Sequence, residues 1–277
     1  MRVLITNDDG ADAYGLSVLQ GIAESLTDDV WVVAPQQSGA SRSIALHAPI
    51  RVHQHSARFY EVHGTPTDCV RVAVFDILKD CRPALILSGV NHGQNVGGDI
   101  FPSGTVAAAI QGSSLGIPSI ALSQALPPYE DTTEIFWDAA QIFGPTIVRA
   151  LVDSGAADQT VLNVNFPACR ARDVRAVLVT SQGFEGCSAT LASSCTDSCE
   201  GDHYWMRFRA RDEAAEGTDL HAIANGSVSV TPLQIDMTVH SLIENLKDDL
   251  GVISARSRER KPLTKADVRR RLTLVRS

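Results

Sequence analysis

Short runs of branched apolar residues alternate with runs of helical periodicity along the first 125 residues, and this alternation constrains the fold more than any other feature. Residues 2–6 (RVLIT) and 30–34 (VWVVA) have the composition of buried strands. Between them, apolar residues recur at helical spacing from Leu16 to Leu26. A strand, a helix and a second strand in this order predict a parallel pair of strands joined by a right-handed crossover.

The same alternation continues further along the chain. Buried strands are expected at 84–88 and 118–122, with a helix that begins at Ser103 between them, and a long helix fits 133–152. Past residue 155 short strand patterns dominate. The other expected elements are strands at 50–53, 58–62, 161–164, 174–180, 204–210 and 228–230, a helix from a cap at Thr67 or Asp68 to about 79, and a helix at about 237–247. We therefore predict an α/β fold with a Rossmann-like, mostly parallel sheet.

The chain divides into three predicted parts. These are a Rossmann-like core at 1–125, a β-rich and helical part at 126–254 that completes the core, and a basic tail at 255–277. The tail holds nine basic and two acidic residues, although the whole chain has a formal net charge of -8. An acidic chain argues against a protein that coats nucleic acid. We favour a solvated tail that docks on its own acidic body or on a neighbouring subunit, with nucleic acid or another acidic partner as the alternative.

The sequence shows neither a secretion signal nor a membrane span. A strand pattern starts at Arg2, which leaves no room for a signal peptide, and no apolar run approaches spanning length. We expect a cytoplasmic protein with no membrane partner, in which the six cysteines are free thiols. Cys187, Cys195 and Cys199 with His203 invite a zinc interpretation, but gaps of seven, three and three residues fit no standard zinc ribbon or finger.

Polar residues follow the expected strands at points that a parallel topology brings together. Asp8 and Asp9 follow the first strand, Ser38 the second and Asn91 the third, and Ser103–Thr105 opens the helix before the fourth. Because ligands bind outside the carboxyl ends of parallel strands, we expect these four segments to meet at one rim. Two carboxylates, a hydroxyl and an amide are hard oxygen donors that suit Mg²⁺ or Mn²⁺ and leave about two octahedral positions free.

The expected helix start is a candidate anion site. Ser103, Gly104 and Thr105 offer backbone N–H groups and hydroxyls there, and glycine lets the backbone approach a ligand closely. Two aspartates would neutralise a divalent cation, so an incoming phosphate would meet little repulsion. A lone Asp-Asp-Gly triplet is usually a turn or a helix cap. Only the joint pattern favours a metal and phosphate site.

Seven motifs occur in the order found in one known family. They are NDDG (7–10), AP…SGAS (34–35 and 38–41), GTPTDCV (64–70), SGVNHGQNVG (88–97), SGTVAAA (103–109), NVNFP (163–167) and VSVTPLQ (228–234). Over residues 1 to about 247 the chain resembles the SurE family, the stationary-phase survival 5′/3′-nucleotidases. The resemblance implies a Rossmann-like N-terminal part and a β-rich C-terminal part that exchanges elements between subunits, giving homodimers or homotetramers.

The resemblance also implies an activity and a set of site residues. The activity is metal-dependent hydrolysis of nucleoside 5′- and 3′-monophosphates, and some members also trim polyphosphate. The implied ligands of one divalent cation per subunit, Mg²⁺ or Mn²⁺, are Asp8, Asp9, Ser38 and Asn91. The implied lining of the phosphate site is Asn95, Ser103, Gly104 and Thr105. In this scheme Asp8 or Asp9 is catalytic, because one of them orients the attacking water and accepts its proton.

The chain departs from the family pattern in two places. The family often reads Ala-Pro-Gly after NDDG, whereas this chain has Ala13-Tyr14-Gly15, so we expect Tyr14 to change the rim of the pocket. The segment SSCTDSCEGDH (193–203) replaces a Pro-Arg-Gly-like turn.

His92, beside Asn91, is an alternative proton donor to the leaving ribose oxygen, although a surface histidine is the favoured interpretation.

Other enzyme classes require motifs that the chain lacks. A haloacid-dehalogenase-type phosphatase requires Asp-x-Asp, and no residue separates Asp8 from Asp9. The Gly-x-Gly-x-x-Gly of dinucleotide enzymes and the Gly-Lys-Ser/Thr of P-loop proteins are absent. The remaining alternative is a non-catalytic, metal-dependent nucleotide sensor built on the same site, which would bind nucleotide without releasing phosphate.

Overall fold

The structure is a computed structural model that describes residues 1–37, 44, 49–127, 135–158, 160–183, 189–197, 201–208 and 214–254. Of residues 189–197, 201–208, 249 and 251–254 it describes the backbone alone. The predictions for Ser38, for the zinc interpretation of the cysteine cluster and for the basic tail lie outside what is described. The chain forms two compact units, Met1–Ile235 and Asp236–Ser277.

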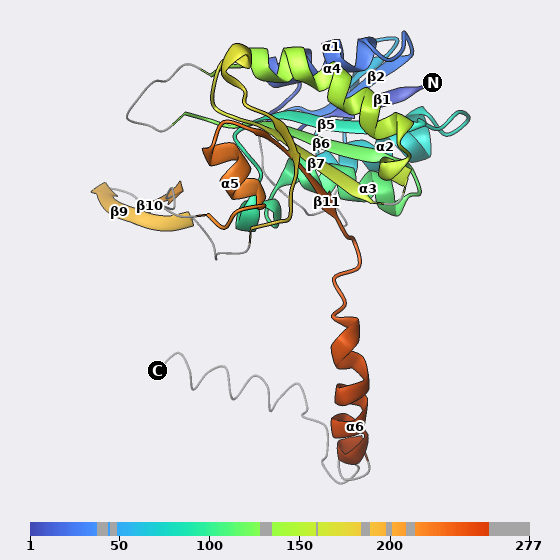
Figure 1. Ribbon diagram of the computed structural model, residues 1–277. Coiled ribbons are helices and arrows are strands. Elements are labelled where there is room, and N and C mark those ends of the chain that lie inside the picture. The colour runs from blue at the N-terminus through green and yellow to red at the C-terminus, as the bar shows by residue number, and fades with distance from the viewer. Residues whose placement is uncertain are drawn as a thin grey trace. The chain divides into compact units, whose positions relative to one another are not determined.

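A nine-stranded sheet forms the centre of the first unit, in the order β3-β4-β2-β1-β5-β6-β7-β11-β8 (Figure 1). Its strands are β1 Val3–Thr6, β2 Val30–Pro35, β3 Val52–Ser56, β4 Phe59–Val62, β5 Leu85–His92, β6 Ser119–Gln124, β7 Val161–Phe166, β8 Val177–Val179 and β11 Val228–Leu233. The pairs β3–β4 and β7–β11 are antiparallel, and the other neighbours are parallel. The prediction of an α/β fold with a mostly parallel sheet is confirmed.

Helices cover both faces of this sheet. Helices α1 (Tyr14–Glu24) and α4 (Asp138–Asp153) lie on one face, and α2 (Pro66–Val72) and α3 (Gly104–Ser114) lie on the other (Figure 1). The side chains of β1 alternate accordingly, because successive residues of a strand point to opposite faces. Val3 and Ile5 belong to the core under α1 and α4, and Leu4 belongs to the core under α2. All three are fully buried, which fixes β1 at the middle of the fold.

The N-cap of helix α2 (Pro66–Val72) lies two residues before the first of the two predicted caps. Thr65, rather than Thr67 or Asp68, is the N-cap: its hydroxyl accepts the Asp68 N–H, and the Asp68 carboxylate accepts the Thr65 N–H at 2.9 Å. This reciprocal capping box suits Pro66 at the first helical position, where no N–H is needed. The helix continues into a single π-helical turn at Ala73–Ile77. Helix α4 starts at Asp138 rather than at 133, with the carboxylate of Asp138 in its first turn.

Strands from the second half of the chain complete the same sheet. Strands β7, β11 and β8 extend it beyond β6, and helix α5 (Asp219–Ala224) precedes β11. Strand β8 is shorter than the predicted 174–180. Strand β9 (Ala189–Asp197) was not predicted; it pairs antiparallel with β10 (Gly201–Phe208) in a separate two-stranded sheet. The division of the chain at residue 125 stays a prediction.

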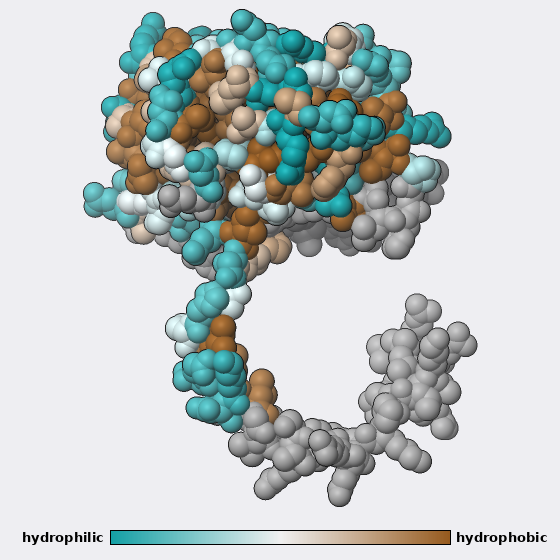
Figure 2. All heavy atoms as spheres, turned by 90° about the vertical axis from the view of Figure 1, so that its right-hand side faces the viewer, coloured by the Kyte–Doolittle hydropathy of each residue, from teal (hydrophilic) through white to brown (hydrophobic). Residues whose placement is uncertain are grey.

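The second unit contains a short helical turn at His240–Leu242 and helix α6 (Ile243–Ser254). Large apolar side chains are exposed along it, namely Met237, Val239, Leu242, Leu246 and Leu250. Figure 2 shows hydrophobic and hydrophilic residues interleaved along this segment. Within the part of the chain that the structure describes, no helix has both the length and the apolar character needed to cross a membrane. The exchange of elements between subunits stays a prediction.

Candidate metal and phosphate site

The candidate site lies at the carboxyl ends of β1 and β5, where successive connections of the chain pass from one face of the sheet to the other. Strand β1 pairs in parallel with β2 on one side and β5 on the other. The chain leaves β1 through α1 on one face and reaches β5 through α2 on the opposite face. Such a switch point opens a crevice at the carboxyl ends of the two central strands. Asp8 and Asp9 come directly after β1, and Asn91 is near the end of β5, so both segments face this crevice.

Asp8 is anchored to the start of helix α3. Asp8 is 6 % exposed, and its carboxylate accepts hydrogen bonds from both donors of Thr105, the backbone N–H at 3.0 Å and the hydroxyl. Ser103 caps the same helix, because its hydroxyl accepts the Val106 N–H. The positive end of the helix therefore faces a carboxylate, which it stabilises. Both Thr105 donors, predicted to line a phosphate site, are directed to Asp8 here.

Gly104 makes this close approach possible. A Cβ atom at that position would lie 2.8 Å from Oδ2 and 2.9 Å from Cβ of Asp8, closer than any real side chain tolerates. Any other residue would push α3 away from the carboxylate. The glycine expected to admit a ligand thus also admits Asp8, and the predicted segments after β1 and before α3 do meet.

Asp9 is tied to the end of β5. Its Oδ2 atom accepts the backbone N–H of His92 at 2.8 Å, and it is more exposed than Asp8. Asn91, the residue before, donates its side-chain amide to the carbonyl of Gly93 at 2.8 Å. Since the amide nitrogen is engaged, the Oδ1 atom of Asn91 is the atom available to a cation. It accepts no hydrogen bond from any described residue.

Burial raises the pKa of both aspartates. For Asp8, removal from water raises the pKa from 3.8 to about 6, the Thr105 hydroxyl and N–H act against this, and the charge of Asp9 adds to it. The pKa of Asp9 is raised mainly by burial, while the backbone N–H and the positive charge of His92 oppose the rise. Two neighbouring carboxylates that are costly to ionise form a site that a cation would relieve.

The donor set fits a hard divalent cation. Across the described residues, no three or more His, Cys, Asp or Glu side chains are arranged to hold a metal ion. Asp8, Asp9 and the Oδ1 atom of Asn91 offer carboxylate and amide oxygens, the donor class that Mg²⁺ and Mn²⁺ take. The buried Oδ1 atom of Asn7, just before this pair, also accepts no hydrogen bond from the residues that the structure describes.

Asn95 is held in place by a cluster of amides on the neighbouring strands. Its backbone N–H donates to Oδ1 of Asn165 at 2.8 Å, and its carbonyl accepts the side-chain amides of Asn163 and Asn165. Its own side-chain amide donates to the Ser123 hydroxyl at 2.9 Å. These contacts fix the loop after β5 against β6 and β7, so Asn95, whose side-chain amide keeps a second N–H, is held on a rigid backbone.

Comparison with known proteins gives a consistent result. The family model described as survival protein SurE matches residues 3–188. The chain belongs to the SurE family. It is 48 % identical over 254 residues to the 5′-nucleotidase SurE of Caulobacter vibrioides (strain NA1000 / CB15N), covering 91 % of this chain and 97 % of that protein. It is 43 % identical over 257 residues to the 5′-nucleotidase SurE of Parvibaculum lavamentivorans, covering 92 % of each.

A solved SurE structure has the same fold. The crystal structure of the SurE protein from Aquifex aeolicus superposes with a TM-score of 0.78 at 35 % identity, covering 90 % of this chain and 99 % of that one. The family and the fold class expected from the sequence motifs are therefore confirmed. The roles of the individual site residues stay predictions.

The polar network that supports the loop after β5 in this SurE-family chain was not predicted from the sequence. Asn163 and Asn165 alternate within a strand that is otherwise apolar, so they share one face. Two amides on one face of a buried strand were the available signal. Asp219 was also missed. It is fully buried, and its carboxylate accepts the backbone N–H groups of Gly97, Gly183 and Leu220 at 2.8 to 2.9 Å.

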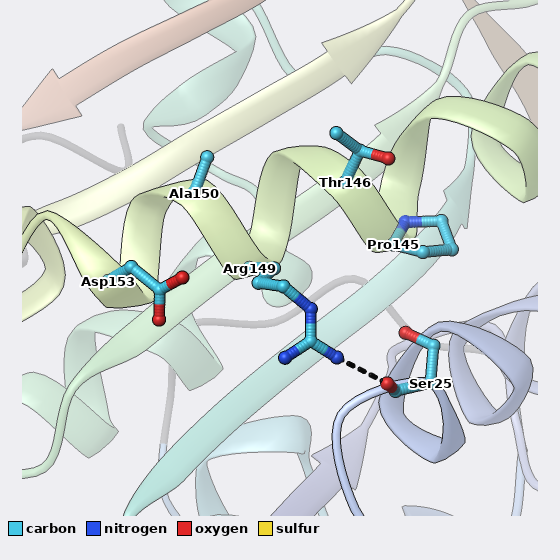
Figure 3. Close-up of a pocket in the computed structure, with 6 residues that line it drawn as sticks. All are labelled: Ser25, Pro145, Thr146, Arg149, Ala150 and Asp153. Atoms are coloured by element: carbon cyan, nitrogen blue, oxygen red, sulfur yellow. Dashed lines mark hydrogen bonds between the residues drawn. The ribbon is translucent and has the colours of Figure 1, made fainter.

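A second hollow lies away from this site. It is lined by Ser25, Pro145, Thr146, Arg149, Ala150 and Asp153, at the end of α1 and along α4 (Figure 3). The Arg149 guanidinium donates to the carbonyl of Ser25 across it. Among the described residues that line it, Asp153 is the single acid, so this hollow does not offer the carboxylate pair of the candidate site.

Proposed function

We propose that the chain is a metal-dependent phosphomonoesterase that hydrolyses nucleoside 5′- and 3′-monophosphates to nucleoside and phosphate, and that polyphosphate is a further substrate. The observation that carries this is the anchored pair Asp8 and Asp9 at the switch point. Relatives over nine-tenths of the chain, all named 5′-nucleotidase, confirm the coarser prediction of nucleotidase activity. We also propose a cytoplasmic homodimer or homotetramer without a membrane or nucleic-acid partner.

One divalent cation per subunit, Mg²⁺ or Mn²⁺, would be held by Asp8, Asp9, Asn91 and Ser38. The Thr105 donors occupy one lone pair on each oxygen of Asp8, and a carboxylate oxygen keeps a second lone pair for a cation. A bound cation would supply Lewis acidity toward the phosphoryl group and a lower pKa for water. The raised pKa values of the two aspartates favour this assignment, since the cation would offset their ionisation cost.

The phosphate would bind between the loop after β5 and the start of α3. Ser103 keeps a hydroxyl proton to donate while it accepts the Val106 N–H, and the Gly104 N–H belongs to the first, unpaired turn of the helix. Asn95 adds a side chain from the rigid loop. These donors would stabilise negative charge on the phosphoryl oxygens in the transition state. Thr105 would contribute indirectly, through Asp8.

Asp9 would accept the proton of the attacking water. Both oxygens of Asp8 are engaged by Thr105, whereas Oδ1 of Asp9 accepts no hydrogen bond from a described residue and the side chain is partly exposed. Asp8 would then position the cation, and Asp9 would orient the water and take its proton.

The test is phosphate release from a panel of nucleoside 5′- and 3′-monophosphates and from polyphosphate, with Mg²⁺, with Mn²⁺ and with a chelator. We expect metal-dependent release that Asp8→Asn and Asp9→Asn both abolish while the proteins stay folded. Nucleotide binding without release would identify the sensor instead. Release that persists in the chelator would refute the metal-dependent assignment.

A further inference from the structure

Three aromatic rings from distant parts of the sequence lie together next to Asp9. Tyr14 opens helix α1, His92 ends strand β5 and Trp137 precedes helix α4. The Tyr14 and Trp137 ring centroids are 5.5 Å apart at an angle of 60°. The His92 and Trp137 ring centroids are 6.4 Å apart at 27°. These separations are within the range at which aromatic side chains interact, so the three rings form one surface.

This surface is attached rigidly to the candidate site. The backbone N–H of His92 donates to Asp9, which fixes the backbone of this residue beside the carboxylate pair. Gly15 lets α1 pack directly on β5, because a Cβ there would lie 1.9 Å from the Val90 carbonyl and 3.1 Å from the Trp137 ring. The rings therefore keep their place relative to the end of β5, where Asn91 lies.

Only one of the three rings packs against the hydrophobic core, so core packing does not explain the position of the other two. Trp137 is partly buried and packs against the core under α1 and α4. Tyr14 is 58 % exposed and His92 is also exposed. The Tyr14 hydroxyl accepts the side-chain amide of Gln141 at 3.3 Å, which orients the ring without covering it. Exposed aromatic surface of this kind beside a charged crevice is typical of a binding site.

We infer that Tyr14, Trp137 and His92 form the platform on which the base of the substrate stacks. The inference rests on the proposed function, since a nucleoside monophosphate places one flat base a single ribose away from its phosphate. Rings that already pack on one another lose little conformational freedom on binding. Every base has a flat face, so a stacking platform accepts many nucleotides and favours the larger purines.

The test compares two substrates that differ in the base. Adenosine 5′-monophosphate carries a base, and ribose 5-phosphate carries the same phosphorylated sugar without one. For Tyr14→Ala we expect KM for the nucleotide to rise about tenfold with little change in kcat, as loss of one stacking ring implies. The kinetic constants for ribose 5-phosphate should stay at the level of the unmodified protein. Tyr14→Phe keeps the ring and should restore KM for the nucleotide.

Two further variants separate this platform from other causes. Phe75→Ala removes an exposed aromatic ring from the π-helical turn on the opposite face of the sheet, and it should change neither substrate. Phe101→Ala removes an exposed ring two residues before Ser103, which makes it the competing platform. A nucleotide-specific loss in Phe101→Ala but not in Tyr14→Ala would overturn the assignment.

The remaining outcomes show whether the stacking platform or the proposed phosphomonoesterase activity is at fault. An equal loss for both substrates in Tyr14→Ala would show that the ring only supports the geometry of Asp9, and it would overturn the platform while leaving the phosphomonoesterase intact. A protein that releases phosphate from neither substrate would refute the proposed function first, and the platform with it.

Discussion

Replacing Asp8 with asparagine should make the metal-free protein more stable, although it should end catalysis. The pKa of Asp8 rises from 3.8 to about 6, mainly because the carboxyl is buried. Since each pKa unit corresponds to about 1.4 kcal/mol, the ionised side chain costs the fold about 3 kcal/mol. Asparagine has the same shape and no charge. Its Oδ1 atom would accept the Thr105 N–H, and its amide would donate to the Thr105 hydroxyl oxygen.

The sign of the pH dependence follows from the direction of the pKa change. Below about pH 4 the carboxyl is protonated in both states, and above about pH 6 it is ionised in both. Between these values the native state holds the proton that the unfolded chain has lost, so Asp8 lowers stability as pH rises. The variant lacks this dependence. The two proteins should therefore be equally stable near pH 4, and Asp8→Asn should be up to about 3 kcal/mol more stable at pH 7.

The measurement is urea unfolding followed by circular dichroism, in chelator, at pH 4.5, 6 and 7. Asp12→Asn is the matched control, because it removes an exposed carboxylate from the same segment and should change stability by less than about 0.5 kcal/mol. Added Mn²⁺ should stabilise the unmodified protein and not Asp8→Asn. A variant that is less stable than the unmodified protein at pH 7, or a difference that does not change with pH, would refute the reasoning.

Two further predictions concern the same site, and a third concerns the buried carboxylate of Asp219. Gly104→Ala should reduce kcat at least a hundredfold, because its Cβ would lie 2.8 Å from Asp8 Oδ2, whereas Gly21→Ala, with open space around it, should keep full activity and gain about 0.5–1 kcal/mol. Apparent Mn²⁺ affinity, measured by calorimetric titration, should fall about tenfold per pH unit below pH 6, since a proton competes for Asp8; a flat profile from pH 5 to 7 would contradict this. Asp219→Asn should cost about 1–3 kcal/mol in urea unfolding, because one of its backbone donors, the Gly97 N–H, would face an amide; unchanged stability would show that the loop does not depend on this carboxylate.

The fold could be predicted from the sequence where one residue pattern had one physical solution. The runs at 2–6, 30–34 and 84–88 are too apolar to lie anywhere but the middle of a sheet, and they became β1, β2 and β5. Element ends were less accurate, because they depend on local caps such as the Thr65 pair with Asp68. Strand β9 was missed because its sequence, ATLASSCTD, has no alternating apolar pattern.

For the candidate site, the meeting of three described segments could be predicted, whereas the contacts between them could not. The rule for parallel sheets placed Asp8, Asp9 and Asn91 at one edge, and the structure joins these segments through Thr105 and His92. No sequence pattern could show that both donors of Thr105 would go to Asp8, since that depends on how closely α3 approaches β1. The distance between α3 and β1 depends on tertiary packing, because it is set by Gly104 and by the side chains on both faces of the sheet.

Two buried aspartates show why burial alone does not mark a functional acid. Asp219 is fully buried, and burial raises its pKa, but three backbone N–H groups of its own fold satisfy it. Asp8 is almost as buried and has its Thr105 donors, yet a second carboxylate stands beside it at an edge that reaches solvent. Where the fold places two negative charges side by side without a compensating positive charge, a bound cation would supply that charge. The unmatched charge of the Asp8 and Asp9 pair, more than its depth, is the reason that we propose a cation site there and a structural role for Asp219.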